Sequence, residues 1–140
     1  MIDRAVAALF ACLLAIAPAF AAPADPTAAA LQRCLDDPAH GATAGQSACI
    51  GRATQSYDRR LNAAYRTLLR LLPAPAAAQL RTAQRQWLVF RNADVAARGA
   101  LYETRQGTMY VPMQGQADMQ LVRDRALQLE GDLRVFRIDG

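Results

Sequence analysis

The chain has 140 residues, of which 53% are apolar and 20% charged, and its formal net charge is +4. This length fits one domain and excludes a two-domain enzyme, and the composition excludes a disordered or fibrous chain. Every basic residue is Arg, which excludes a lysine nucleophile and a P-loop lysine. A single histidine, His40, offers little for a metal site or a catalytic triad. We therefore expect no enzyme, no cofactor and no metal.

The first 21 residues have the pattern of a cleaved secretory signal peptide. Arg4 precedes an apolar run over residues 5–20, and Ala-Phe-Ala at 19–21 forms a small-x-small cleavage signature. The alternative is a transmembrane helix, but Pro18 interrupts the run, which is shorter than the roughly 20 residues that a bilayer requires. We predict export to the periplasm, with no transmembrane segment after processing. Cleavage removes one Arg and one Asp, so the net charge stays at +4.

Two cysteines, Cys34 and Cys49, remain after this cleavage. In an oxidising compartment two thiols most simply form one disulfide, and we predict this bond. The alternative is a redox-active pair, but the wide spacing lacks the C-x-x-C pattern of such sites. His40 lies between them with no ligand partners nearby in sequence, and we interpret it as an exposed loop histidine.

The mature chain divides into a flexible N-terminus over 22–30 and a helical domain over 31–135. A short helix can form within 27–37 and overlaps the end of the flexible segment, and Pro38 ends it. No alternation of apolar and polar residues is long enough to build a sheet.

Three long amphipathic helices follow in the sequence. Apolar residues at helical spacing predict helices over 47–72, 76–102 and 116–133. Pro-Ala-Pro at 73–75 separates the first two, and the Gly- and Pro-containing stretch 106–115 predicts a loop before the third. Short connections between long helices favour antiparallel neighbours. We predict an all-α fold, a small antiparallel bundle of three main helices plus a short N-terminal helix, with one disulfide.

Polar residues embedded in the apolar stripes are the first candidate site. They are Asp58, Asn62 and Tyr65 in the first long helix and Gln84, Trp87 and Arg91 in the second. Residues three and four apart share a helical flank, so an Asp and an Arg can face each other across two packed helices as a charge-assisted pair. One carboxylate without a partner acid or histidine is little for catalysis. We interpret the set as a polar clasp that fixes the helix register, in preference to an acid–base pair.

The loop 107–113 is the second candidate site. Its residues Met109, Tyr110, Val111 and Met113 are costly to expose, and Met and Tyr are common at binding surfaces. Two interpretations stay open here. The four side chains either contact a partner or fold back to cap the bundle.

The motifs together resemble the LprI-like lysozyme inhibitor family, which comprises small exported bacterial proteins or domains. The resemblance runs from about Leu31 to Leu129 and rests on the two cysteines, the D-x-x-L-N-x-x-Y motif at 58–65, the A-Q-x-x-W-x-x-F-R motif at 83–91 and the downstream Gly-Thr-Met loop. It implies a periplasmic all-α domain that inhibits lysozyme. Arg125 matches the family's Arg in the last helix and joins the polar clasp. A second cysteine pair, usual in the family, is replaced here by Val95 and Ala117.

Two hypotheses of function follow. The first is a periplasmic, non-enzymatic binding protein that blocks the cleft of a lysozyme or another cell-wall hydrolase with the loop 107–113. The second is an envelope structural or stress module that binds cell-wall or membrane components and inhibits no enzyme. The arginines are spread along the chain without an aromatic platform, so we expect no nucleic acid partner.

Overall fold

The structure is a computed structural model that describes residues 24–138. The predicted signal peptide therefore lies outside the described residues. The elements in chain order are α1 (Pro26–Asp36), the 3-10 turn η1 (Pro38–His40), α2 (Thr43–Leu71), α3 (Ala74–Glu103) and α4 (Tyr110–Phe136). No strand occurs within 24–138, so the predicted all-α architecture with three main helices and a short N-terminal helix is confirmed.

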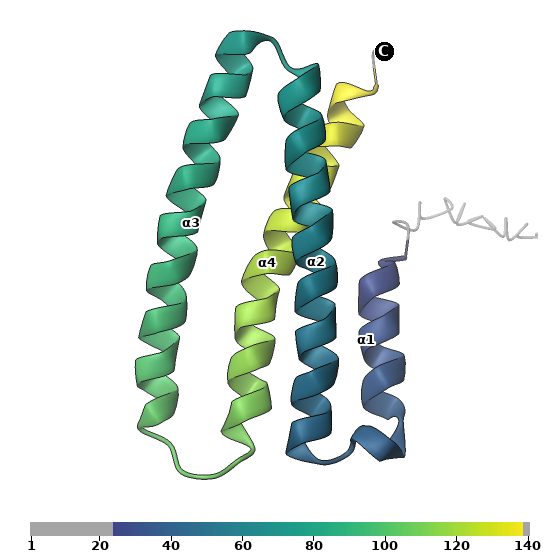
Figure 1. Cartoon of the computed structure of the whole chain (residues 1–140), viewed down its shortest axis with the longest axis vertical. Helices are drawn as coiled ribbons and strands as arrows, with labels where there is room; N and C mark the ends of the chain where they lie inside the picture. The colour runs from purple at the N-terminus through teal and green to yellow at the C-terminus, as the bar shows by residue number, and fades with distance from the viewer. Residues whose placement is uncertain (1–23, 139–140) are drawn as a thin grey trace, which may run out of the picture.

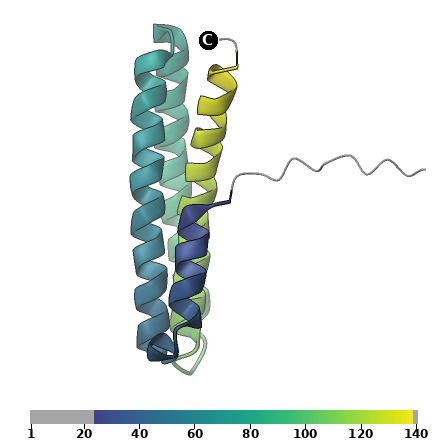
Figure 2. The same ribbon diagram turned by 90° about the vertical axis from the view of Figure 1, so that its right-hand side faces the viewer.

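The helices run alternately down and up the long axis of the molecule, as predicted for short connections. Figure 1 shows α1 along one half of α2, while α3 stands on the other side of the α2–α4 pair. The view turned by 90° places α1 in front of α4 and keeps α3 behind α2 (Figure 2). One end of the bundle therefore carries η1 and the α3–α4 connection, and the other carries the α2–α3 connection and the C-terminus.

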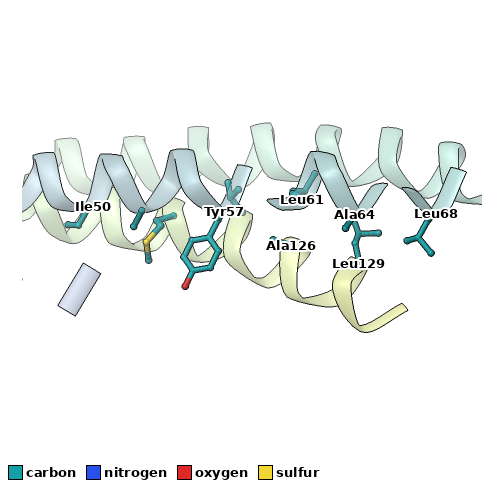
Figure 3. Packing of buried hydrophobic residues seen from close by; sticks show 10 residues of the cluster. Ile50, Tyr57, Leu61, Ala64, Leu68, Ala126 and Leu129 are labelled. Carbon is teal, nitrogen blue, oxygen red and sulfur yellow. The ribbon is translucent and has the colours of Figure 1, made fainter. Parts of the chain in front are cut away.

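The core lies between α2 and α4. Figure 3 shows side chains of α2 pointing toward α4, where Ala126 and Leu129 lie beside them. The buried cluster comprises Ile50, Ala53, Tyr57, Leu61, Ala64 and Leu68 from α2 and Met119, Val122, Ala126 and Leu129 from α4. The apolar spacing of these two helices thus places one continuous stripe from each against the other.

The N-terminal segment is more ordered than the sequence indicated. Asp25 caps α1, since its Oδ1 accepts a hydrogen bond from the backbone N–H of Thr27 at 3.0 Å, and Pro26 takes the first helical position, where its missing N–H costs nothing. Residues 26–30, which we assigned to the flexible N-terminus, therefore form the first turns of α1. The buried Thr27 fixes this start against α2, because its Oγ1 lies 3.0 Å from Ser56 Oγ.

The predicted disulfide between Cys34 and Cys49 is present, with 5.8 Å between the two Cα atoms. The connection that it closes is shorter than predicted, since α2 begins at Thr43 instead of 47. Gly45 permits this early start. A Cβ at Gly45 would lie 2.6 Å from the Cα of His40, so only glycine lets η1 pack this closely on α2.

The prediction of a loop over 106–115 was wrong in extent, because α4 begins at Tyr110. The cause of this error is Pro112, because a proline commonly marks a loop or the end of a helix. Pro112 occupies the third position of the helix, where a backbone N–H has no intrahelical partner, so the proline ring removes no hydrogen bond. Gly115 lies within α4, and a Cβ there would be 3.6 Å from Ile50 Cγ2. The connection between α3 and α4 is therefore only residues 104–109.

The α3 helix packs far less than α2 and α4 do. Its buried residues are only Ala77 and Gln84, whereas Val89 and Phe90 are exposed. Partly buried Leu80 and Trp87 touch the main core from this helix. Across residues 24–138, no helix combines enough length with enough apolar character to cross a membrane.

Candidate functional site

An apolar groove opens at the end of the bundle that carries the α3–α4 connection. Its volume is about 750 Å³, within the range of small-ligand and peptide-anchor sites. The groove is lined by Leu35, Thr43, Gln46, Ile50, Tyr102, Met109, Pro112, Met113, Gln116, Ala117 and Gln120. Two regions that are distant in sequence thus meet here: the junction of α1 and α2, and the junction of α3 and α4.

Two of the four predicted partner-binding residues line this groove. Met109 and Met113 line it, and both are exposed, Met109 by 61%. Val111 is 58% exposed and does not line the groove. Tyr110 is half-buried, with its ring 6.4 Å from the ring of Tyr102. Of the two interpretations, exposure on a surface fits Met109, Val111 and Met113, whereas only Tyr110 folds back onto the bundle.

The connection that presents these residues has a defined backbone. Gly107 has φ +115°, a conformation that favours glycine. On either side of it, the Thr104 hydroxyl donates to the carbonyl of Leu101, and the N–H of Tyr110 donates to the carbonyl of Gly107. Thr108 is also tied to α2 through a contact of 3.5 Å with the Thr43 hydroxyl. These bonds hold the backbone of the turn, and Met109 directly precedes the first residue of α4.

The residues of the predicted polar clasp do gather, but the expected Asp–Arg pair is absent. Among the ion pairs of the described residues, none joins Asp58 to Arg91. Asp58 instead accepts a hydrogen bond from Asn62 Nδ2 at 3.0 Å on its own helix. Arg91 lies over the ring of Trp87, with its Cζ 5.3 Å from the ring centroid, and donates to Asn92. Asp58 and Arg91 each bond within their own helix, so the predicted pair across the two helices is not formed.

The contact that does cross between helices is Gln84 to Arg125. The Nε of Arg125 donates to Gln84 Oε1 at 3.0 Å, and its Nη1 donates to Gln128 on the next turn of α4. Its Cζ also lies 5.9 Å from the centroid of Trp87. Arg125 is only 8% exposed, and burial lowers its pKa from the ordinary value. This contact is therefore a hydrogen-bonded link between α3 and α4, with Arg125 at its centre.

An ion network at the other end of α1 was not predicted from the sequence. Arg60 of α2 donates from Nη1 to Asp25 Oδ1 at 2.5 Å and from Nη2 to Glu130 Oε2 of α4 at 2.7 Å. The Tyr57 hydroxyl donates to Asp25 Oδ2 at 2.6 Å. The network thus joins the cap of α1 to both core helices. The Asp-Pro pair at 25–26 was a readable signal of a helix start, but nothing local connects Arg60 with Glu130.

This network shifts the pKa values of its members. Burial raises the pKa of Asp25, but hydrogen bonds from Tyr57 and Arg60 and the charge of Arg60 outweigh burial, so the pKa of Asp25 is lowered overall. Burial and the hydrogen bond to Asp25 raise the pKa of Tyr57 to about 12. The hydrogen bond to Glu130 raises the pKa of Arg60. All three shifts favour the ionised carboxylate and guanidinium and the neutral phenol, so the network has a fixed charge state at neutral pH.

Two aspartates, Asp94 of α3 and Asp118 of α4, lie near Arg98. Arg98 donates to Asp94 at 2.5 Å along α3. The side-chain Oδ1 of Asp118 is buried without a hydrogen-bond partner among the described residues, and burial raises the pKa of Asp118.

One group of potential metal ligands lies within the described residues, namely Cys34, His40 and Cys49. The two sulfur atoms are already joined in the disulfide, so only the imidazole could bind a metal, and one ligand is too few. His40 is half-buried, with its Nδ1 4.0 Å from Cys34 Sγ, and is therefore less exposed than predicted.

Comparisons with known proteins agree with this architecture. A crystal structure of an uncharacterised protein from Burkholderia thailandensis is 36% identical in sequence, with a TM-score of 0.77. The similarity covers 82% of this chain and 57% of that chain, so the present chain spans little more than half of that protein. No curated protein shows significant similarity. The family of the lysozyme inhibitor LprI matches residues 34–129, which include both cysteines, the clasp and the α3–α4 connection. Because this match covers more than half of the chain, the protein belongs to the LprI lysozyme inhibitor family.

Proposed function

We propose that this protein is a periplasmic, non-enzymatic binding protein that inhibits a lysozyme by blocking its substrate cleft with the α3–α4 end of the bundle. Membership of an inhibitor family supports the activity. The observation that carries the site is the set of exposed apolar side chains at the start of α4, of which Met109, Val111 and Met113 are the largest. Exposed apolar residues beside a groove are typical of a protein-binding surface.

The shape of this end suits insertion into a cleft. The α3–α4 connection is a turn of only a few residues between two long helices, and the hydrogen bonds around Gly107 fix it. A prearranged turn loses little conformational freedom when it binds. Because Met109 is the first large side chain after this turn, it is the natural anchor, with Val111 beside it.

The same connection also carries a positive charge. Arg105 is exposed two residues before Gly107. A glycosidase cleft contains a pair of carboxyl groups, which a guanidinium can engage through charge-assisted hydrogen bonds. With a net charge of +4, the protein is steered toward lysozymes of negative or neutral charge and away from strongly basic ones. We therefore expect acidic lysozymes to be inhibited most strongly, and added salt to weaken that inhibition.

The test is the lysis of cell-wall suspensions by a panel of lysozymes of different net charge, titrated with the oxidised protein from residue 22 onward. We expect dose-dependent inhibition of at least one lysozyme. Its loss in a Met109→Ala/Val111→Ala double variant, with unchanged thermal unfolding, is the expected signature of this surface. The matched control is Val135→Ala, because Val135 is 67% exposed near the opposite end of α4.

The variants also separate the anchors. Tyr110 is half-buried against Tyr102, so Tyr110→Ala is expected to weaken inhibition by displacing the start of α4 and to lower stability slightly. Full inhibition by the Met109→Ala/Val111→Ala protein would contradict the proposed surface. A protein that inhibits no lysozyme, but binds cell walls or anionic vesicles, would instead support an envelope-binding module.

Export is the remaining part of the proposal. It rests on the Arg4-led apolar run over residues 1–21 and on the disulfide, which persists in an oxidising compartment. Fractionation of cells that express the full chain, with N-terminal sequencing of the product, tests it. Recovery of the uncleaved chain in the cytoplasm would contradict it.

A further inference from the structure

A second, polar cleft lies between α2 and α3, away from the groove at the end of the bundle. Its volume is about 280 Å³, just below the range of about 300–1,000 Å³ for drug-sized ligands. Three arginines of α3 line it, namely Arg81, Arg85 and Arg91, and the one carboxylate in its lining is Asp58 of α2. The cleft therefore has an excess of two positive charges.

These arginines have no acidic partners in the part of the chain that the structure describes. The ion pairs there involve other residues. Arg85 donates only to Thr82 and Arg91 only to Asn92, both on the same helix. Arg81 and Arg85 are four residues apart and therefore neighbours on one flank of α3, so their like charges repel each other and an anion bound between them would relieve this repulsion. The charge of the cleft thus favours an anionic ligand.

The opposite side of the cleft offers groups that pair with hydroxyls. Asn62 uses its Nδ2 toward Asp58, so the Oδ1 of Asn62 and one carboxylate oxygen of Asp58 can accept hydrogen bonds from a ligand. Gln84 uses its Oε1 for Arg125, so its Nε2 can donate one. A ligand that only carried negative charge would be repelled by Asp58. A ligand with hydroxyls at one end and an anion at the other satisfies both sides.

The groups of the cleft are held in position from behind. Gln84 is bound by Arg125, and Arg91 lies over the ring of Trp87. Arg125 itself is more than nine-tenths buried, and its Nη2 has no hydrogen-bond partner in the described residues. Prearranged polar groups of this kind lower the entropic cost of binding a small ligand.

We infer that the α2–α3 cleft binds a carboxylated monosaccharide, with the carboxylate on Arg81 and Arg85 and the sugar hydroxyls on Asp58, Asn62 and Gln84. The volume admits a single sugar ring and not a folded polymer. This inference does not depend on lysozyme inhibition, because the two sites share no lining residue.

The single tryptophan of the chain provides the measurement, because Trp87 lines the cleft. The protein is titrated with glucuronate, and the Trp87 fluorescence and its indole N–H NMR signal are followed at low salt. Glucose, which lacks the carboxylate, is the matched ligand control. N-acetylmuramate and N-acetylglucosamine form a second pair, in which the acid carries its carboxylate on an added lactyl ether, and test whether the source is a cell-wall sugar. We expect saturable changes with both acids, or with the muramate alone, and at least tenfold weaker binding of each neutral partner.

Variants locate the site. Arg81→Gln/Arg85→Gln is expected to weaken binding at least tenfold, whereas Arg33→Gln, on the exposed surface of α1, leaves it unchanged. Both variants keep the helix intact, since Gln is a good helix former, and far-UV circular dichroism verifies this. Any one of three results would overturn the inference: no response of either Trp87 signal to the acids, equal binding of acids and neutral sugars, or equally tight binding of inorganic sulfate.

Discussion

The α2–α4 pair and helix α3 differ in what holds them in place. The α2–α4 pair buries a continuous apolar stripe from each helix, including Tyr57, Met119 and Leu129 with almost no exposed surface. Helix α3 is as long as α2, yet it buries only Ala77 and Gln84 and is linked to α4 through Arg125. The apolar pair supplies stability, which leaves α3 free to present exposed residues, a polar cleft and the connection to α4. Both surfaces that we propose for binding involve α3.

The largest expected effect separates the two regions directly. Leu129→Ala removes a side chain with 0% exposure from the α2–α4 core, and large-to-small changes at such positions cost about 3 kcal/mol. Val89→Ala on α3 shortens a side chain that is 65% exposed, so its cost stays within about 0.5 kcal/mol. Urea unfolding of the two variants measures both values, and equal costs would show that α3 is as much a part of the core as α4.

Removing the disulfide comes next. In the chain-entropy model a loop of this size contributes about 3 kcal/mol, because Cys34 and Cys49 are 15 residues apart. A Cys34→Ser/Cys49→Ser variant is expected to lose most of this, although the end of α4 that we propose to bind lysozyme stays formed. Urea unfolding and circular dichroism test the two parts of this statement. A variant as stable as the oxidised protein would mean that η1 and Gly45 alone fix the start of α2.

The ion network ties α1 to the stable pair and has a smaller effect. Arg60→Gln leaves the carboxylates of Asp25 and Glu130 without their shared cation, at a cost of about 2 kcal/mol for these partly buried groups. The matched variant is Arg59→Gln, since Arg59 is exposed next to it on α2. Urea unfolding is the measurement, and a similar loss in both variants would argue against a specific role of the network.

The same network makes the stability of the folded protein depend on pH in the acidic range. Because the pKa of Asp25 is lower in the folded protein than its ordinary 3.8, its stabilisation is fully present above that value and is lost as the pH falls through the folded pKa. Asp118 acts in the opposite direction, since burial raises its pKa and its contribution is lost as the pH rises. Unfolding between pH 2 and 6 is therefore expected to depend less on pH in Asp25→Asn and more in Asp118→Asn. The reverse order would contradict these charge environments.

The smallest expected effect on global stability comes from a change in the link between α3 and α4. Gln84→Ala removes the hydrogen bond to Arg125, which is worth about 1.5 kcal/mol, the lower end for a charged donor. Because α3 packs little, we expect the loss to appear mainly as faster amide exchange within 74–103 and less as a change in global unfolding. Gln79→Ala, the same change at an exposed position of α3, is the control. Uniformly faster exchange in α2 and α4 would show that the two regions unfold together.

The same contrast explains what the sequence could predict. The apolar stripes of α2 and α4 were readable, since their spacing dominates the packing. The start of α4 at Tyr110 was missed because a proline in the first turn has the same sequence signal as a loop. The clasp was predicted as a set of residues, but its pairing was not, because Asp58 and Arg91 bond within their own helices and Gln84 pairs with Arg125 of α4. Arg60 and Glu130 lie 70 residues apart, and no local pattern connects such a pair.

Hydrogen exchange of this protein, alone and bound to a lysozyme that it inhibits, tests the central claim most directly. The account predicts slower exchange at 104–113, which carries the exposed Met109 and Val111, with no change in the α2–α4 core. Slower exchange elsewhere on the surface, with 104–113 unchanged, would contradict the assignment of the inhibitory surface to the α3–α4 end.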